Sequence, residues 1–296
     1  MSLEEYLRKI YSESTFYSNL FNIRRFTDYY GKRSEKATYK EVLNYIEHLR
    51  KNYDLSPRTL KHCLSGVKIY FNYLLAIGKR SDHPCSELYL KDKIDKRIQV
   101  DTLYSMETLE QLYESYQIKR KKELSNRNKI IISLLIYQAL TVGEIVSLEV
   151  SDIDLEKGEI YIKGSSNIKS KSPKSRTLSL KAKQVLLIYT YLQKDRKAIL
   201  KRHRKSLEEP RFIIGQYGEA IKAHGITRII NQYQDREAIT PIKIRQSVIA
   251  HLMKKENDAR VVQEFAGHRK VSTTLQYSQS DLEILQKAIE LYHPLQ

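Results

Sequence analysis

The chain has 296 residues, with 52 Lys and Arg against 35 Asp and Glu, and therefore a formal net charge of +17 at pH 7. The length predicts two domains of ordinary size. The charge argues against an enzyme of small molecules and favours a polyanionic partner, because each neutralised phosphate releases counterions. A membrane surface also attracts basic proteins, so the charge alone indicates only a class of partner.

The sequence has neither the pattern of a membrane protein nor that of a secreted one. Its first five residues lack the basic and apolar regions of a signal peptide. The longest apolar run, residues 130–140, is interrupted by polar residues and is shorter than the ~20 residues that a membrane span needs. Cys63 and Cys85 fit neither a disulfide framework nor a zinc-ligand pattern, so we expect two buried reduced thiols in a cytoplasmic protein.

Residues 1–90 are predicted to form a small bundle of four amphipathic helices. Apolar residues recur at helical spacing near residues 3–10 and again near residues 20–30. Short connections between four such helices are typical of a small bundle.

Local start signals predict the third and fourth helices of this bundle. Thr38 followed by Glu41 is a capping-box pattern, which predicts that a helix begins directly after Thr38. Ser56 followed by Pro57 is typical of an N-cap and a first helical position, and Gly78 predicts the end of that last helix.

A charged segment, residues 91–104, is predicted to link the bundle to a second domain over residues 105–296. Its apolar residues lack helical periodicity, which is typical of an exposed linker. In the second domain, helices are expected to about residue 148, and then a pair of strands at 159–163 and 176–180. Helices are expected from there to the end, so the fold class is mainly α with a small β-sheet.

The last third of the chain holds the most specific pattern. Thr240-Pro241 opens a helix that carries Arg245, Gly267-His268 follows, and Ser272-Thr273-Thr274 then precedes Tyr277. His268 comes 23 positions after Arg245, and Tyr277 comes nine positions after His268. The pattern resembles the signature of the tyrosine recombinases, the phage integrase/Xer family, in which T-P-H-x-x-R precedes L-G-H and then S-T-T-x-x-Y.

Two upstream segments extend the resemblance, and two positions depart from it. Residues 140–153 look like the family segment G-L-R-x-S-E-L-x-x-L-x-x-x-D-I, and residues 171–176 look like its K-G-x-K-x-R hairpin. Thr141 stands where the family has its first catalytic arginine, and Ile242 stands where it has the histidine of H-x-x-R. These departures bear on activity rather than on fold.

The resemblance implies a catalytic set of Tyr277, Arg245, His268 and Lys171, supported by Glu144. Tyr277 would attack a DNA phosphodiester and carry a covalent 3′-phosphotyrosyl link. Arg245 would bind the non-bridging oxygens, and His268 would donate a hydrogen bond to the phosphate. Lys171 would protonate the departing 5′-oxygen. Because the link conserves the energy of the broken bond, neither a cofactor nor a metal is expected.

The resemblance also implies a two-domain, C-shaped clamp around double-stranded DNA, with a core-binding (SAM-like) domain at residues 1–90 and a catalytic domain at 105–296. Homo-oligomers are expected, namely tetramers on paired sites. A helix at about residues 280–292 would exchange with a neighbouring protomer, although a helix packed within its own chain fits the spacing equally well. DNA contacts are expected from seven basic residues: Lys169, Lys174, Arg176, Lys243, Arg269, Arg58 and Lys61.

Each site residue also has an ordinary structural explanation when it is taken alone. Tyr277 is one of 22 tyrosines, and only its spacing distinguishes it from a packing residue. His268 alone is typical of a helix end, and Arg245 alone of a surface ion pair. Lys171 shares its basic turn with other lysines, so the turn can equally be a solvated loop.

Two hypotheses about function follow. The first is a site-specific recombinase that cuts and rejoins DNA, for a mobile element. The second is a catalytically degenerate family member that binds DNA as an architectural or regulatory protein. The first is favoured by the retained catalytic set, namely Tyr277, Arg245, His268 and Lys171. The second is favoured by Thr141 and Ile242. An RNA-binding protein has no aromatic RNP-type motif to support it.

Overall fold

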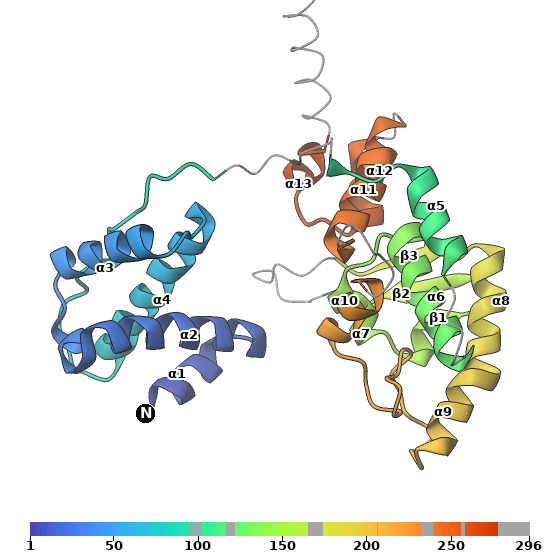
Figure 1. The fold of residues 1–296 in the computed structure, drawn as a ribbon, viewed down its shortest axis with the longest axis horizontal. Helices are drawn as coiled ribbons and strands as arrows, with labels where there is room; N and C mark the ends of the chain where they lie inside the picture. Colours follow the sequence, from blue (N-terminus) through green and yellow to red (C-terminus); the bar gives the residue numbers. More distant parts are fainter. Residues whose placement is uncertain are drawn as a thin grey trace, which may run out of the picture. The chain divides into compact units, whose positions relative to one another are not determined.

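The protein is described from a computed structural model. The chain divides into two compact units, Met1–Lys96 and Arg97–Gln296 (Figure 1). Each unit has its own hydrophobic core. The described residues are mainly helical with one three-stranded antiparallel sheet, which confirms the predicted fold class. The predicted domain limits and the predicted clamp stay predictions. The structure describes residues 1–94, 98, 102–116, 122–164, 174–205, 207–231, 239–255 and 258–277.

The first unit is a helical bundle, as the sequence predicts. Its elements are α1 (Leu3–Ile10), α2 (Glu13–Tyr30), the 3-10 helix η1 (Gly31–Lys36), α3 (Tyr39–Asn52) and α4 (Pro57–Ala76). The predicted start signals form: the Thr38 hydroxyl accepts from the backbone N–H of Glu41, and the Ser56 hydroxyl accepts from that of Thr59. Both cysteines are buried free thiols, as predicted.

Close packing of α2 against α4 holds this bundle together. The Phe26 ring of α2 makes edge contacts with Tyr70 and Phe71 of α4, at centroid distances of 6.1 and 5.9 Å. Gly66 of α4 faces Asn22 of α2 so closely that a Cβ added to Gly66 would lie 2.5 Å from the Asn22 Cβ. The glycine therefore sets the distance between the two helices.

The second unit is larger and contains the sheet. Its first elements are α5 (Met106–Ser115), α6 (Lys122–Tyr137), α7 (Val142–Ser147), the 3-10 helix η3 (Val150–Asp152), β1 (Ile153–Asp154), β2 (Glu159–Ile162) and β3 (Arg176–Ser179). Seven helical elements follow among the described residues: α8 (Ala182–Thr190), the π-helix η4 (Tyr191–Asp195), α9 (Arg196–Arg202), α10 (Ala223–Asn231), α11 (Pro241–Lys254), α12 (Ala259–Ala266) and α13 (Val271–Leu275). The two predicted strands are confirmed, whereas β1 was not predicted.

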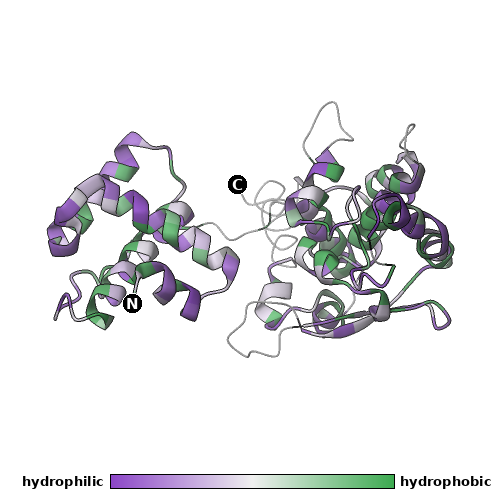
Figure 2. Cartoon of the chain, turned by 90° about the horizontal axis from the view of Figure 1, so that it is seen from below, coloured by the Kyte–Doolittle hydropathy of each residue, from purple (hydrophilic) through white to green (hydrophobic). Residues whose placement is uncertain are grey.

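The apolar run of α6 forms the centre of this unit. Its isoleucines and leucines between residues 130 and 136 are almost completely buried, and Figure 2 shows hydrophobic residues gathered towards the interior. In the sheet, Ile160 of β2 pairs with Leu178 of β3, and Ile162 pairs with Arg176. None of the described helices is long and apolar enough to cross a membrane.

We predict that Gly66→Ala destabilises the first unit despite the better helix propensity of alanine. Alanine gains about 1 kcal/mol over glycine in a helix, but overpacking costs about 1–3 kcal/mol, and a methyl group at 2.5 Å from Asn22 forces the helices apart. Native-state hydrogen exchange of the α2 and α4 amides in the full chain measures the effect. Ser65→Ala, at an exposed neighbour on α4, is the matched control and should not accelerate exchange. Equal exchange in the two variants would contradict the prediction.

Candidate active site

Two arginines from distant parts of the chain meet at the C-terminal end of α12. Arg245, in the second turn of α11, donates from Nη2 to the carbonyl of Ala266 at 2.6 Å and from Nη1 to the carbonyl of Ala139. Arg176, the first residue of β3, donates from Nε to the carbonyl of Phe265 at 2.7 Å. The last carbonyls of a helix lack intrahelical partners and carry partial negative charge, so they suit two cations.

Glu144 connects Arg176 to the beginning of α7. Its Oε1 accepts from Arg176 Nη1 at 2.5 Å, and the two side chains are only 5% and 3% exposed. Its Oε2 accepts from the backbone N–H and the hydroxyl of Thr141, at 2.7 and 2.9 Å. Burial by itself raises the pKa of Glu144, but Arg176 and the Thr141 backbone lower it below its ordinary value. Glu144 is therefore an anion at neutral pH.

His268 and Tyr277 lie beside this arginine pair. Gly267 ends α12 with a positive φ of 69°, which turns the chain so that His268 follows at once. The His268 Nδ1 lies 2.9 Å from the Thr274 hydroxyl, and the ring stacks on that of Tyr277 at a centroid distance of 6.2 Å. Burial raises the pKa of the Tyr277 phenol, and the charge of Arg245 opposes that rise.

The electrostatics keep His268 neutral. Burial, first, and then the positive charges of Arg245 and Arg176 lower its pKa from 6.5 to about 4. At neutral pH the imidazole can therefore donate one hydrogen bond and accept another, but it is not a third cation in the site.

The structure thus brings Arg245, His268, Tyr277 and Glu144 together, as the motif spacing suggests. Lys171 and Lys169 lie outside the described residues, and so does the predicted exchange helix. The hairpin base is nevertheless fixed near the site, because the backbone N–H of Lys174 donates to the carbonyl of Gly267 at 2.9 Å. The Lys174 side chain is exposed.

The two departures from the family motif have different surroundings. Thr141 is the N-cap of α7 and forms a capping box with Glu144. Ile242 lies in the first turn of α11 with 70% of its surface exposed, and its hydrocarbon side chain can neither donate nor accept a hydrogen bond. Lys243, the next residue, places its Nζ 5.0 Å from the centre of the Tyr104 ring.

The remaining basic residues with predicted DNA contacts have various surroundings. Arg58 is exposed on α4, and Lys61 donates from Nζ to the carbonyl of Asp92 at 2.9 Å. Arg269 is half-buried directly after His268, and Arg176 is buried. The inward position of Arg176 was not predicted, although the alternation of β3 places it on the same face as Leu178.

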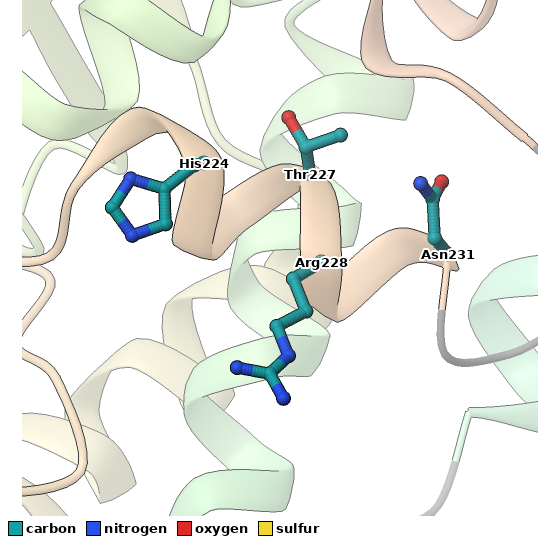
Figure 3. Close-up of a pocket in the computed structure, with 4 residues that line it drawn as sticks. All are labelled: His224, Thr227, Arg228 and Asn231. Carbon is teal, nitrogen blue, oxygen red and sulfur yellow. The ribbon is translucent and has the colours of Figure 1, made fainter.

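A polar face of α10 was not singled out from the sequence either. Four residues line a shallow pocket of about 470 Å³ on this helix (Figure 3), namely His224, Thr227, Arg228 and Asn231. The opposite face of α10 is buried through its isoleucines, and the helix packs against α7. Hydrogen-bonding side chains of this kind on an exposed helix suit contacts to phosphates or base edges. In the described part of the chain, no group of three or more His, Cys, Asp or Glu side chains is arranged to hold a metal ion.

The fold and the converging arginine, histidine and tyrosine agree with the comparison to known families. Residues 105–283 match the phage integrase family, and residues 2–78 match the N-terminal SAM-like domain of phage integrases. The chain therefore belongs to the phage integrase family, the tyrosine recombinases.

Similar proteins include recombinases and a resolvase. Tyrosine recombinase XerD of Oceanobacillus iheyensis is 25% identical over 292 residues, which cover 96% of this chain and 93% of that protein. TnP I resolvase of Bacillus thuringiensis is 26% identical over 271 residues, which cover 91% and 89%. Among solved structures, XerH bound to palindromic difH substrate in a post-cleavage complex has a TM-score of 0.67 at 21% identity, covering 94% of this chain and 80% of that chain. The Tn1549 transposon integrase with transposon right end DNA has a TM-score of 0.63 at 13% identity, covering 95% of each chain. These two structures show that the fold is shared.

We predict that the His268 ring titrates near pH 4, well below an exposed histidine. Because the folded pKa is depressed, the folded state binds fewer protons than the unfolded chain between about pH 4 and pH 6.5. The contribution of His268 to the free energy of unfolding is therefore fully present above pH 6.5 and is lost as the pH falls towards 4. NMR titration of the ring protons measures the midpoint directly, and His268→Gln should remove this part of the pH dependence of unfolding. His224→Gln, at an exposed histidine, should follow the parent. A midpoint near 6.5 would show that neither burial nor the two arginines lower the pKa of this ring.

Proposed function

We propose that this chain is a site-specific DNA recombinase that cuts and rejoins strands through a 3′-phosphotyrosyl intermediate on Tyr277, and that it serves a mobile element. The observation that carries the proposal is the convergence of Arg245, His268 and Tyr277 at the end of α12, in a member of this family. The family resemblance to a resolvase and to a transposon integrase supports the mobile element. We place the activity in the cytoplasm.

In the proposed reaction, the Tyr277 phenol gives up its proton to water as its oxygen forms a bond to the scissile phosphorus, and the bond from phosphorus to the 5′-oxygen breaks. Lys171 gives a proton to that departing oxygen. Arg245 is held by two backbone carbonyls, so its remaining N–H groups are oriented for the non-bridging oxygens. His268 uses Nδ1 for Thr274, which leaves Nε2 for the phosphate. The reverse attack by a 5′-hydroxyl releases Tyr277 and joins the strands.

Binding of double-stranded DNA rests mainly on charge in this proposal. The excess of 17 positive charges, the exposed Arg58 and Lys174, and the polar face of α10 supply contacts to the phosphates and grooves. We extend to this chain the assembly expected of the family, a homo-tetramer on paired sites. A related solved structure is a lambda integrase dimer on a core site, which supports a homo-oligomer on DNA.

A second candidate function is DNA binding without cleavage. Its support is specific: Thr141 uses its hydroxyl to cap α7, and Ile242 presents a hydrocarbon surface where the family motif has a histidine. Covalent adduct formation separates the two candidates, since only a recombinase leaves protein attached to a nicked duplex.

We predict that Tyr277→Phe abolishes covalent adducts and leaves DNA affinity within about twofold, because one hydroxyl contributes little to a charge-dominated interface. Duplexes selected by binding from a random pool, nicked near each candidate scissile position, serve as substrates. Adducts are detected by denaturing electrophoresis. Tyr217→Phe, at an exposed tyrosine on the surface, is the matched control and should retain the parent yield. Adducts at the parent level in Tyr277→Phe would exclude this nucleophile.

We also predict a steep salt dependence of binding. The logarithm of the association constant should fall linearly with the logarithm of the salt concentration, with a slope of about −0.9 for each phosphate contacted. Fluorescence anisotropy at several salt concentrations measures this slope for the full chain. A flat plot would rule out the electrostatic account of binding.

A further inference from the structure

The beginning of α7 lacks the guanidinium that the family motif has there, but another guanidinium lies next to it. Thr141 shares Glu144 with Arg176: the Thr141 hydroxyl donates to Oε2 at 2.9 Å, and Arg176 Nη1 donates to Oε1 at 2.5 Å. One carboxylate thus separates the position of the missing arginine from a buried cation. Thr141, which lacks the charge of the family arginine, and the cation Arg176 therefore belong to the same hydrogen-bonded cluster.

Arg176 has one nitrogen without an acceptor. Nε and Nη1 are held by the carbonyl of Phe265 and by Glu144, while Nη2 is buried and donates to none of the described residues. A buried donor without an acceptor costs free energy, and such groups are rare in native proteins. A guanidinium fixed through two nitrogens, with the third unused, is preorganised to bind an oxyanion.

The unused nitrogen belongs to the same site as Arg245. The acceptor of Arg176 Nε, the carbonyl of Phe265, directly precedes the acceptor of Arg245 Nη2, the carbonyl of Ala266. The two charges also act on the same groups, since Arg176 adds to the lowering of the pKa of Arg245 and of His268. A phosphate that binds Arg245 therefore enters the field of Arg176.

Two other described cations near this site are less suited to the role. Lys243 lies over the Tyr104 ring, and the Lys174 side chain is exposed. Arg176 matches the last arginine of the family hairpin motif, so its presence alone is not unusual. In this chain, however, no guanidinium at position 141 competes with it for Glu144 or for the phosphate.

We propose that Arg176 supplies the second guanidinium of this active site, and that its Nη2 binds a non-bridging oxygen of the scissile phosphate in place of the arginine replaced by Thr141. This inference rests on the proposed function. Tyr277 is itself 8% exposed, so the proposal requires that DNA binding expose both the nucleophile and Arg176 Nη2. The phosphate then provides the acceptor that Nη2 lacks, and Glu144 holds the guanidinium in place.

The test compares a charged with a neutral scissile linkage. Single-turnover adduct formation is measured on nicked duplexes that carry either a phosphate or a methylphosphonate, in which a methyl group replaces one charged non-bridging oxygen. With the phosphate, Arg176→Met should reduce the cleavage rate roughly 10²–10³-fold. With the methylphosphonate the same variant should lose less than about tenfold, since less charge develops there. Lys157→Met, an exposed lysine on the β1–β2 turn, controls for loss of one positive charge and should match the parent on both substrates.

Arg176→Lys keeps a cation next to Glu144. It therefore tests whether the effect of Arg176→Met is due only to misfolding. A lysine has one nitrogen and cannot bind Glu144 and a phosphate through two separately fixed nitrogens. The cleavage rate of Arg176→Lys should therefore also fall much more on the phosphate than on the methylphosphonate. Thr141→Arg should restore cleavage at least tenfold in the Arg176→Met background and should leave the parent unchanged or slower. Equal losses on the two linkages, or a large gain from Thr141→Arg in the parent, would overturn the assignment of Arg176 alone. A parent that forms no adduct on either linkage would overturn the proposed function together with it.

Discussion

The buried ion pair between Glu144 and Arg176 fixes the relative positions of three segments that are far apart in the sequence. Glu144 lies in the first turn of α7, and Arg176 is the first residue of β3. The Arg176 Nε donates to the carbonyl of Phe265 at the end of α12. Removing one member of a buried pair typically costs about 3–5 kcal/mol, because the remaining charge stays uncompensated. The same carboxylate caps α7 through Thr141, so the fold of the unit and the geometry of the site depend on one anion.

Local signals in the sequence predict much of the fold, and long-range contacts account for what they miss. Thr38 and Ser56 begin α3 and α4 as their side chains dictate, since capping is decided within four residues. β1 has only two residues and exists because it pairs with β2, so no periodicity could reveal it. The close approach of Gly66 to Asn22 likewise depends on how two helices cross, which no local pattern specifies.

In the candidate site, too, the sequence predicts some features, and others depend on long-range contacts. The spacing of Arg245, His268 and Tyr277 is a property of the sequence, and the structure brings these three together at the end of α12. Their orientation comes from backbone groups that carry no side-chain signature. The carbonyl of Ala139 receives Arg245 because Ala139 adopts a positive φ of 48°, an unusual conformation for a residue with a Cβ, between α6 and α7. The inward face of Arg176 follows from strand alternation, but its pairing with Glu144 requires the tertiary fold.

The side chain at position 141 cannot both cap α7 and bind the phosphate of the proposed reaction. A threonine N-cap stabilises α7 by typically about 1 kcal/mol. An arginine at this position would add a cation but would lack the capping hydroxyl. With threonine in place, the described core of the site carries two guanidinium charges, one carboxylate charge and a neutral His268, which amounts to one net positive charge. A phosphodiester monoanion matches that charge. In the proposed reaction, this anion offsets the charge of the two cations that help to depress the pKa of His268. Its binding would therefore favour a protonated imidazole, and with it a stronger hydrogen bond to the phosphate.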